Sequence, residues 1–171
     1  MLRKLMVVAA LALLPAMAAQ AQFQQGDYEL TLSGSGSNGP DFNVTDFGVN
    51  GNLGYFLTKE LEVGVRQSAS YADDQGAGSA WFGSTRLALD YHFDLGRVQP
   101  YIGGNIGYQY GDIHNTWEAA PEAGIKWFVN STTFIQLGVE YQFFFDQDSD
   151  ASSSFSDGRF LYGLGIGFRW H

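Results

Sequence analysis

Apolar and polar residues alternate with a period of two in eight separate stretches of this chain. In the last stretch, RFLYGLGIGFRWH, every second position from Phe160 to Trp170 is large and apolar, whereas the intervening positions are arginine, leucine or glycine. Successive residues of a strand point to opposite faces, so this alternation indicates strands with one apolar face. It predicts strands over residues 27–36, 44–56, 60–71, 81–93, 100–111, 117–128, 133–145 and 159–170.

The connections between these stretches also alternate in character. Residues 57–59, 94–99 and 129–132 form short connections, whereas 35–43, 72–80, 111–116 and 146–157 are mostly longer and rich in Gly, Ser, Asn and Asp. A meander with short turns at one end and longer loops at the other is typical of outer-membrane barrels. After the N-terminal segment, no stretch has the ~18 consecutive apolar residues of a transmembrane helix.

The composition of the two faces separates a membrane barrel from a soluble sandwich. A soluble sandwich would expose large charged residues on its polar face, but this polar face is dominated by Gly, Ser, Asn and Gln, which suit a narrow barrel interior. The apolar face carries aromatic residues near the strand ends, as at a membrane interface. We expect a short-turn girdle of Tyr55, Tyr91, Phe93, Trp127, Phe168 and Trp170, and a long-loop girdle of Phe47, Tyr71, Trp81, Tyr108, Tyr110, Trp117, Phe143 and Phe160.

The pattern therefore predicts an all-β fold, a transmembrane eight-stranded antiparallel up-and-down β-barrel. The sheet must close, because lipid offers no partner to an open edge. Pro121 strains this scheme, since it cannot donate to the ladder of the strand at 117–128. Either a bulge lies there or that strand begins after the proline. A secreted soluble β-protein is the alternative fold.

The N-terminal residues predict where the protein is located. Arg3 and Lys4 precede an apolar run, and Ala19-Gln20-Ala21 fits a small-x-small cleavage pattern, which together predict a secretory signal peptide. We expect residues 1–21 to be removed, with cleavage after Ala19 as the alternative, and residues 22–171 to form the barrel domain. The net charge of −9 and the lack of a basic run argue against a nucleic-acid partner. The chain has no cysteine and thus no disulfide framework.

Charged residues of both signs share the polar, inward face. An unpaired charge there is costly, so we expect an interior ionic network in which most charges pair across strands. Hairpin counting puts Lys126 diagonal to Glu140, and barrel closure brings Arg169 near Asp27 or Glu29. The network either fills the bore or lines a path for small solutes. Its expected members are Glu29, Asp46, Glu62, Arg66, Arg86, Asp90, Glu118, Glu122, Lys126, Glu140, Arg159 and Arg169.

Two other features of the sequence could carry chemistry. The Asp-x-Asp-x-Asp spacing from Asp146 resembles the start of a calcium loop, but Ala151 stands where the turn glycine is needed, so an acidic surface loop is the simpler interpretation. A catalytic Ser-His-acid set would need His114 with Asp112 and Thr116, or His92 with Asp90 and Ser84. We assign no catalytic residue, no metal site and no cofactor.

The mature sequence resembles the family of small bacterial outer-membrane β-barrels that includes the OmpA transmembrane domain, OmpW and OmpX. The signal peptide, FLTKELEVGV (56–65), VQPYIGGNIGY (98–108), PEAGIKWFV (121–129) and the closing Phe168-Arg169-Trp170 carry the resemblance. It implies that the last strand is the signal for the barrel-assembly machinery, carried by Tyr162, Leu164, Ile166, Phe168 and Trp170. His171 departs from the family pattern by following the final aromatic residue.

Together these features predict a structural or surface-interaction protein of the bacterial outer membrane, with a filled bore. A narrow porin-like channel is the alternative, and a lipid A-modifying enzyme is a third possibility. The expected partners are outer-membrane lipids, lipopolysaccharide and, during insertion, the barrel-assembly machinery. The oligomeric state stays open.

Overall fold

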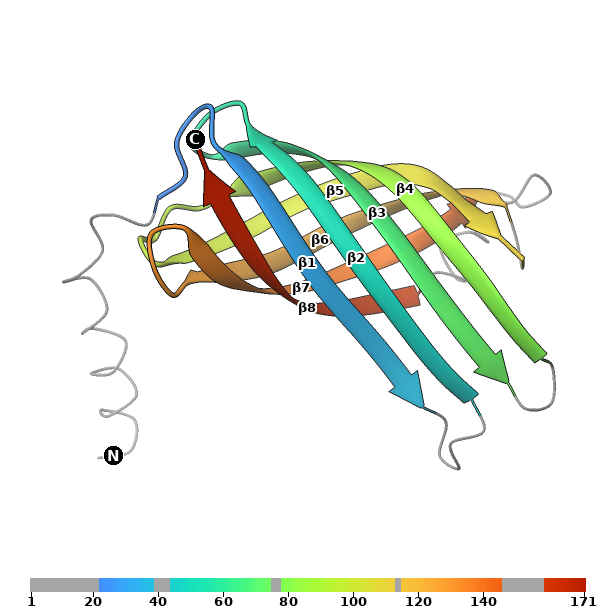
Figure 1. Ribbon diagram of the computed structural model, residues 1–171. Coiled ribbons are helices and arrows are strands. Elements are labelled where there is room, and N and C mark those ends of the chain that lie inside the picture. Colours follow the sequence, from blue (N-terminus) through green and yellow to red (C-terminus); the bar gives the residue numbers. More distant parts are fainter. Residues whose placement is uncertain (1–21, 39–43, 75–77, 113–114, 146–158) are drawn as a thin grey trace, which may run out of the picture.

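The computed structural model describes residues 22–38, 44–74, 78–112, 115–145 and 159–171 (Figure 1). Within these ranges every regular element is a strand, and the strands pair with their sequence neighbours into one closed antiparallel barrel. The strands are β1 (Tyr28–Asn38), β2 (Val44–Phe56), β3 (Leu61–Asp74), β4 (Gly78–His92), β5 (Val98–Gly111), β6 (Thr116–Phe128), β7 (Thr133–Phe145) and β8 (Arg159–Trp170). In the described part of the chain, no helix is long and apolar enough to cross a membrane.

The eight predicted strands are confirmed, and no end moves by more than three residues. The largest changes extend β3 to Asp74 and the start of β4 back to Gly78. The short connections are tight, as expected. In the turn after β4, Gly96 has a φ of 79°, a conformation that glycine adopts without steric cost, and its N–H donates to the Asp94 side chain.

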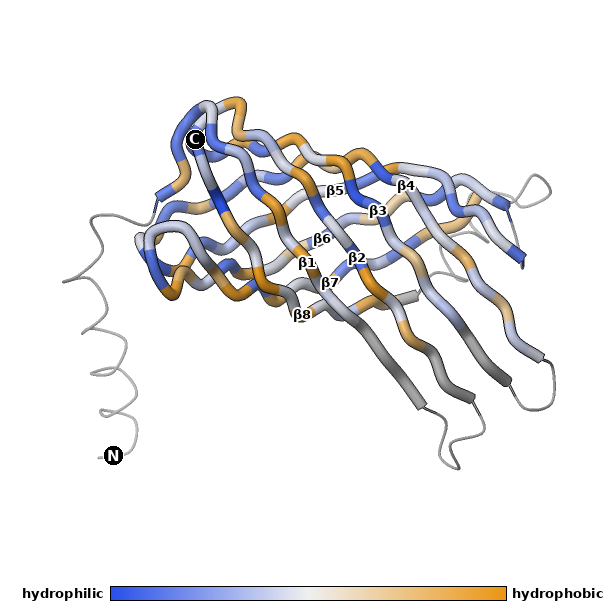
Figure 2. The backbone as a smooth tube through the Cα atoms, in the orientation of Figure 1, coloured by the Kyte–Doolittle hydropathy of each residue, from blue (hydrophilic) through white to orange (hydrophobic). Residues whose placement is uncertain are grey.

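The two faces of the sheet have the predicted assignment. Large apolar side chains are exposed on the outside of the barrel. Figure 2 shows hydrophobic and hydrophilic residues alternating along the strands. Polar and charged side chains such as Glu29, Glu118 and Lys126 are buried inside. This arrangement is the inverse of a soluble protein and matches a barrel surrounded by lipid. Of the expected girdle residues, Tyr110 and Phe143 are half-buried and the other twelve are exposed.

Glycines on the inner face make room for large interior side chains. A Cβ placed on Gly167 would lie 2.0 Å from Cζ of Phe134, and one on Gly103 would lie 2.0 Å from Oδ1 of Asp90. Gly163, on the same face of β8 as Gly167, would meet nothing within 4 Å. The glycines of the closing strand therefore serve two purposes: near the short turns they accept a neighbouring ring, and farther out they border empty space.

Pro121 interrupts one ladder without shifting it. The β6–β7 pairs run from Trp117↔Phe145 to Ala119↔Phe143 and resume at Glu122↔Glu140, so the register is the same on both sides of the gap. On the other side of β6, Pro121 pairs opposite Gly104 of β5. Both expectations for this proline, a bulge or a late strand start, are wrong: the strand begins at Thr116 and tolerates the missing donor by losing local pairing to β7.

Closure of the barrel is incomplete along its length. β1 and β8 pair from Tyr28↔Trp170 to Gly34↔Leu164, in the half of the barrel next to the short turns. Beyond that point the described residues 35–38 of β1 and 159–163 of β8 form no pairs with each other, although β1 continues to pair with β2 and β8 with β7. Figure 1 shows the two strands diverging toward the long-loop end.

Candidate functional site

An aromatic plug closes the bore at the short-turn end. Phe23, Phe56, Phe128 and Phe134 form a buried cluster, in which the ring of Phe23 stacks on that of Phe56 with 3.9 Å between centroids. Phe23 precedes β1, so the segment before the first strand turns into the barrel mouth. Backbone hydrogen bonds hold it there: Gly26 donates to Phe56 (2.9 Å), and Phe56 donates to Asp27 (2.9 Å).

Ionic contacts at the rim fasten this segment to the end of the chain. Nη1 of Arg169 lies 2.7 Å from Oδ2 of Asp27, and the same nitrogen donates to the carbonyl oxygen of Gln22. His171 Nδ1 lies 3.2 Å from the other oxygen of Asp27. Arg169 is paired with Glu29 in the ladder but binds Asp27 through its side chain. The residue after the final aromatic thus contributes to the contact between the two ends of the barrel domain.

A first ionic layer lies directly above the plug and centres on Lys126. Its ammonium nitrogen is 2.5 Å from Oε2 of Glu29 and 2.9 Å from Oε2 of Glu62. Glu62 is also 2.9 Å from Nε2 of His92, and Glu29 accepts from Thr31 at 2.9 Å. Four aromatic rings surround the Lys126 ammonium, with centroids 5.3 to 5.9 Å away, a favourable arrangement for a cation.

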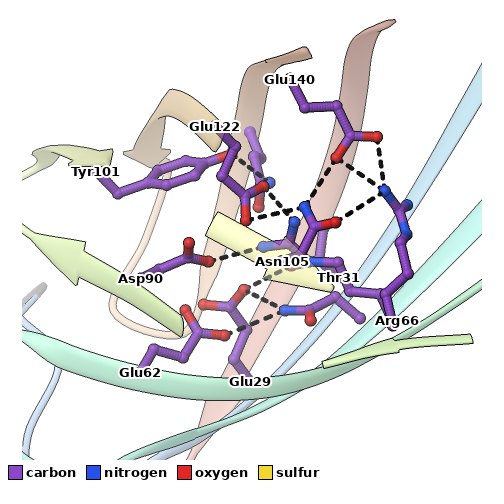
Figure 3. Close-up of polar contacts among 12 residues, drawn as sticks. Glu29, Thr31, Glu62, Arg66, Asp90, Tyr101, Asn105, Glu122 and Glu140 are labelled. Atoms are coloured by element: carbon purple, nitrogen blue, oxygen red, sulfur yellow. Dashed lines mark hydrogen bonds and ion pairs between the residues drawn. The ribbon is translucent and has the colours of Figure 1, made fainter. Parts of the chain in front are cut away.

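A second ionic layer crosses the middle of the bore (Figure 3). Arg66 binds Asp90 at 2.7 Å and also binds Glu122. Arg86 binds Glu140 at 2.8 Å and approaches Glu118 at 3.6 Å. The Asn105 amide joins the two arginine clusters, because it donates to Glu122 at 3.4 Å and to Glu140 at 3.1 Å. The ion pairs connect β3 to β6 and β4 to β7, and therefore brace opposite walls.

The structure brings nine of the twelve expected network residues into these two layers, and Arg169 lies at the rim. The side chains of Asp46 and Arg159 lie outside the described residues. One expected pairing is wrong: Lys126 sits opposite Gln136 in the ladder and binds Glu29 and Glu62, whereas Glu140 binds Arg86. The nine are Glu29, Glu62, Arg66, Arg86, Asp90, Glu118, Glu122, Lys126 and Glu140.

Carboxylates outnumber cations in the two layers. Among the described interior side chains, six carboxylates face three permanent cations, namely Arg66, Arg86 and Lys126. Glu62, Asp90 and His92 offer ligand atoms within 4.8 Å of one another, a spacing that suits a metal ion. Lys126 already binds Glu62 and Arg66 already binds Asp90, so protein cations supply the positive charge at this point. The cluster is best interpreted as part of the ion-pair network.

A polar cavity of about 610 Å³ occupies the other half of the bore. Its floor is the second ionic layer, which includes Arg66, Arg86, Glu122 and Glu140, and its walls carry Ser, Thr, Asn and Gln side chains. The bore therefore has three zones: an aromatic plug, two ionic layers and an open cavity. Sequence reasoning missed the first zone. Phe56, Phe128 and Phe134 do share the inward parity of the charged residues, and that parity was the available signal.

Of the candidate catalytic set His92, Asp90 and Ser84, the structure brings His92 and Asp90 together but not Ser84. His92 is buried against the plug, whereas Ser84 lies eight residues along the same strand, roughly 26 Å away, and hydrogen-bonds to Ser68 at 2.8 Å. Asp112 accepts from the Trp81 backbone (3.1 Å), and Thr116 donates to the Phe145 carbonyl (2.9 Å). His114 and the acidic stretch 146–157 lie outside the described residues.

Comparison with known proteins identifies the class. Residues 6–171 match the model of the outer membrane protein beta-barrel domain, so the chain belongs to this family and is a protein of the Gram-negative outer membrane. No curated protein matches the chain. The short turns therefore face the periplasm and the long loops face outward.

Solved structures show the same fold at low sequence identity. The N-terminal β-barrel domain of Pseudomonas aeruginosa OprF is 20% identical, covers 87% of this chain and 100% of its own, and has a TM-score of 0.57. Pseudomonas aeruginosa OprG is 15% identical with a TM-score of 0.56, over 88% of this chain and 98% of its own. Neisserial surface protein A is 15% identical with a TM-score of 0.54, over 84% and 94%.

Proposed function

We propose that this protein is a closed outer-membrane barrel with a structural or surface-interaction role. The observation that carries the proposal is the filling of the periplasmic half of the bore, where Phe56, Phe128 and Phe134 leave no exposed surface and Lys126 is buried among carboxylates. Ion pairs between opposite walls make this filling rigid, because breaking a buried pair leaves an uncompensated charge. A solute that enters from outside meets the second ionic layer and stops.

Solute flux tests the proposal. Proteoliposomes that contain the refolded barrel are placed in isotonic arabinose or glycine, and swelling is followed by light scattering. We expect the swelling rate to equal that of protein-free liposomes, with a general porin as the positive control. Swelling that rises in proportion to the amount of folded barrel contradicts the closed bore.

A narrow channel is the second candidate function, and the outward cavity favours it. That cavity already opens about half of the bore, and the excess of carboxylates in the ionic layers would make any path through it prefer cations. Under this alternative, proteoliposomes that contain the barrel take up a small cation such as methylammonium. The closed barrel predicts no uptake above protein-free vesicles.

The proposal also covers how the barrel is assembled and what surrounds it in the membrane. Removal of residues 1–21 leaves Gln22 and Phe23 at the new N-terminus, free to enter the barrel mouth. Tyr162, Leu164, Ile166, Phe168 and Trp170 present one apolar face of the last strand to the assembly machinery, and all five are exposed on the folded barrel. The apolar belt contacts outer-membrane lipid and lipopolysaccharide.

We assign no enzymatic activity, because Ser84 lies far along β4 from His92 and Asp90, and a Ser-His-acid set needs all three side chains together. Mass spectrometry of lipid A from cells with and without the protein tests this assignment. Identical lipid A profiles are expected, and a mass change that depends on the protein contradicts the assignment.

A further inference from the structure

The outer half of the β1–β8 seam exposes two strand edges. If the register of the paired half continued, Ser35 would face Gly163 and Gly36 would face Tyr162. No such pair forms among the described residues of this seam, although each strand is fully paired on its other side, as far as Asn38↔Thr45 and Gln142↔Arg159. Unpaired N–H and C=O groups at membrane depth are costly, because hydrocarbon offers no hydrogen bonds. A polar group beside this part of the seam would therefore be favoured.

The polar cavity reaches the seam. Its lining includes inward-facing residues such as Ser33 and Gly163, and also outward-facing aromatic residues that belong to the lipid surface. These are Phe47, Phe160 and Tyr162, with 60%, 62% and 73% of their surface exposed. Phe47 and Phe160 lie near the long-loop end, where β1 and β8 do not pair. The cavity therefore borders lipid-facing residues at this part of the seam.

The chemistry of the cavity indicates what it would accept. Both arginines of the floor are already bound to carboxylates, and carboxylates outnumber arginines there, so the floor disfavours an anionic headgroup. The walls above it carry neutral hydrogen-bonding side chains, among them Ser33, Asn50, Ser68 and Ser84. Such walls suit a neutral group with several hydroxyls. The aromatic residues at the opening suit an aliphatic chain.

We propose that the outer half of the β1–β8 seam is a binding site for a neutral, hydroxyl-rich amphiphile of the outer leaflet. The headgroup occupies the cavity, where its hydroxyls also satisfy the free strand edges, and the acyl chain leaves between Phe47, Phe160 and Tyr162 into the bilayer. This site goes beyond the proposed function, because it depends on the cavity and the seam and not on the plug. If the bore conducted solutes, the proposed binding site would still be present.

Photolabelling tests the site in lipid nanodiscs. The probe is octyl glucoside with a diazirine in its chain, and labelled peptides are identified by mass spectrometry. We expect labelling of the peptides that contain Phe47, Phe160 and Tyr162, and its loss on addition of unlabelled octyl glucoside. Glucose alone should compete at least about tenfold more weakly, since contact of two methylene groups with the wall supplies that factor. Octyl sulfate and octyltrimethylammonium should also compete less well than octyl glucoside.

A variant that blocks the cavity can be compared with a matched variant on the lipid face. In Gly163→Trp the indole enters space that is empty around residue 163, whereas Leu137→Trp places an indole on the lipid face of the neighbouring strand. We expect a tenfold or greater loss of competed labelling in Gly163→Trp and no change in Leu137→Trp. Wild-type labelling spread evenly around the barrel, labelling that octyl glucoside does not compete, or competition by glucose at equal strength would overturn the proposal. Folding of each variant is checked by heat-modifiable gel mobility.

Discussion

Replacing Lys126 with methionine removes the cation that two buried carboxylates share. Glu29 and Glu62 lie 2.5 and 2.9 Å from the ammonium group, and both are excluded from solvent. Methionine keeps most of the volume of the lysine stem, so the variant changes the charge more than the packing. Removal of one partner of a buried ion pair costs about 3–5 kcal/mol, because the remaining charge has no compensation. We expect a loss of this size in the free energy of unfolding.

Urea unfolding in detergent micelles or lipid vesicles measures the loss, with the fluorescence of the four tryptophans and gel mobility as readouts. With a slope of about 2 kcal/mol per molar urea, the midpoint falls by roughly 1.5–2.5 M. The control is Lys59→Met, since the Lys59–Glu60 pair is formed by a lysine side chain that is 63% exposed. Such a surface pair contributes about 0–1 kcal/mol.

A second variant separates charge from packing. In the triple variant Lys126→Met, Glu29→Gln and Glu62→Gln, no uncompensated charge remains at the site, so we expect it to recover roughly half or more of the lost stability. A smaller loss in Lys126→Met than in Lys59→Met would contradict the role of Lys126 as the shared cation. A triple variant no more stable than the single one would contradict it as well.

Three further changes test other parts of the structure. Gly167→Ala places a Cβ against the Phe134 ring and should cost about 1–3 kcal/mol in urea unfolding, whereas Gly163→Ala points into open space and should change stability little. Phe23→Ala removes a ring from the plug, and because the surrounding rings cannot fully close the gap we expect a loss of about 3 kcal/mol by the same measurement. Trp170→Ala should lower the fraction of heat-modifiable, membrane-inserted protein in cells while the purified variant still refolds in detergent; equal insertion would contradict the assembly role of the last strand.

The strands were predictable because the bilayer imposes one rule on all of them. A lipid-facing residue must be apolar, and the narrow bore favours polar or small residues, so a period of two persists through every crossing. The same rule failed at the periplasmic end. Phe56, Phe128 and Phe134 have inward parity but are aromatic, and they were not recognised as a plug. Phe23 precedes any strand, so no alternation indicated that its ring enters the barrel.

The partners of the interior charges were not predictable, for a geometric reason. Hairpin counting gives the register of neighbouring strands, but most ion pairs here cross the bore. Lys126 of β6 binds Glu29 of β1, and Arg86 of β4 binds Glu140 of β7. Such contacts depend on how far the sheet shears when it closes, which a single hairpin does not contain. The surroundings of Arg169 were easier to predict, because closure of the barrel brings the last strand against the first.

The central claim is that the aromatic plug and the two ionic layers close the bore. Single-channel recording in planar bilayers tests this claim most directly. The refolded wild-type barrel is added after its heat-modifiable gel shift shows that it is folded, and a general porin confirms that insertion can be detected. We expect a quiet baseline in 1 M KCl at all applied voltages after the barrel has inserted. Discrete, reproducible conductance steps from the folded wild-type protein would contradict it.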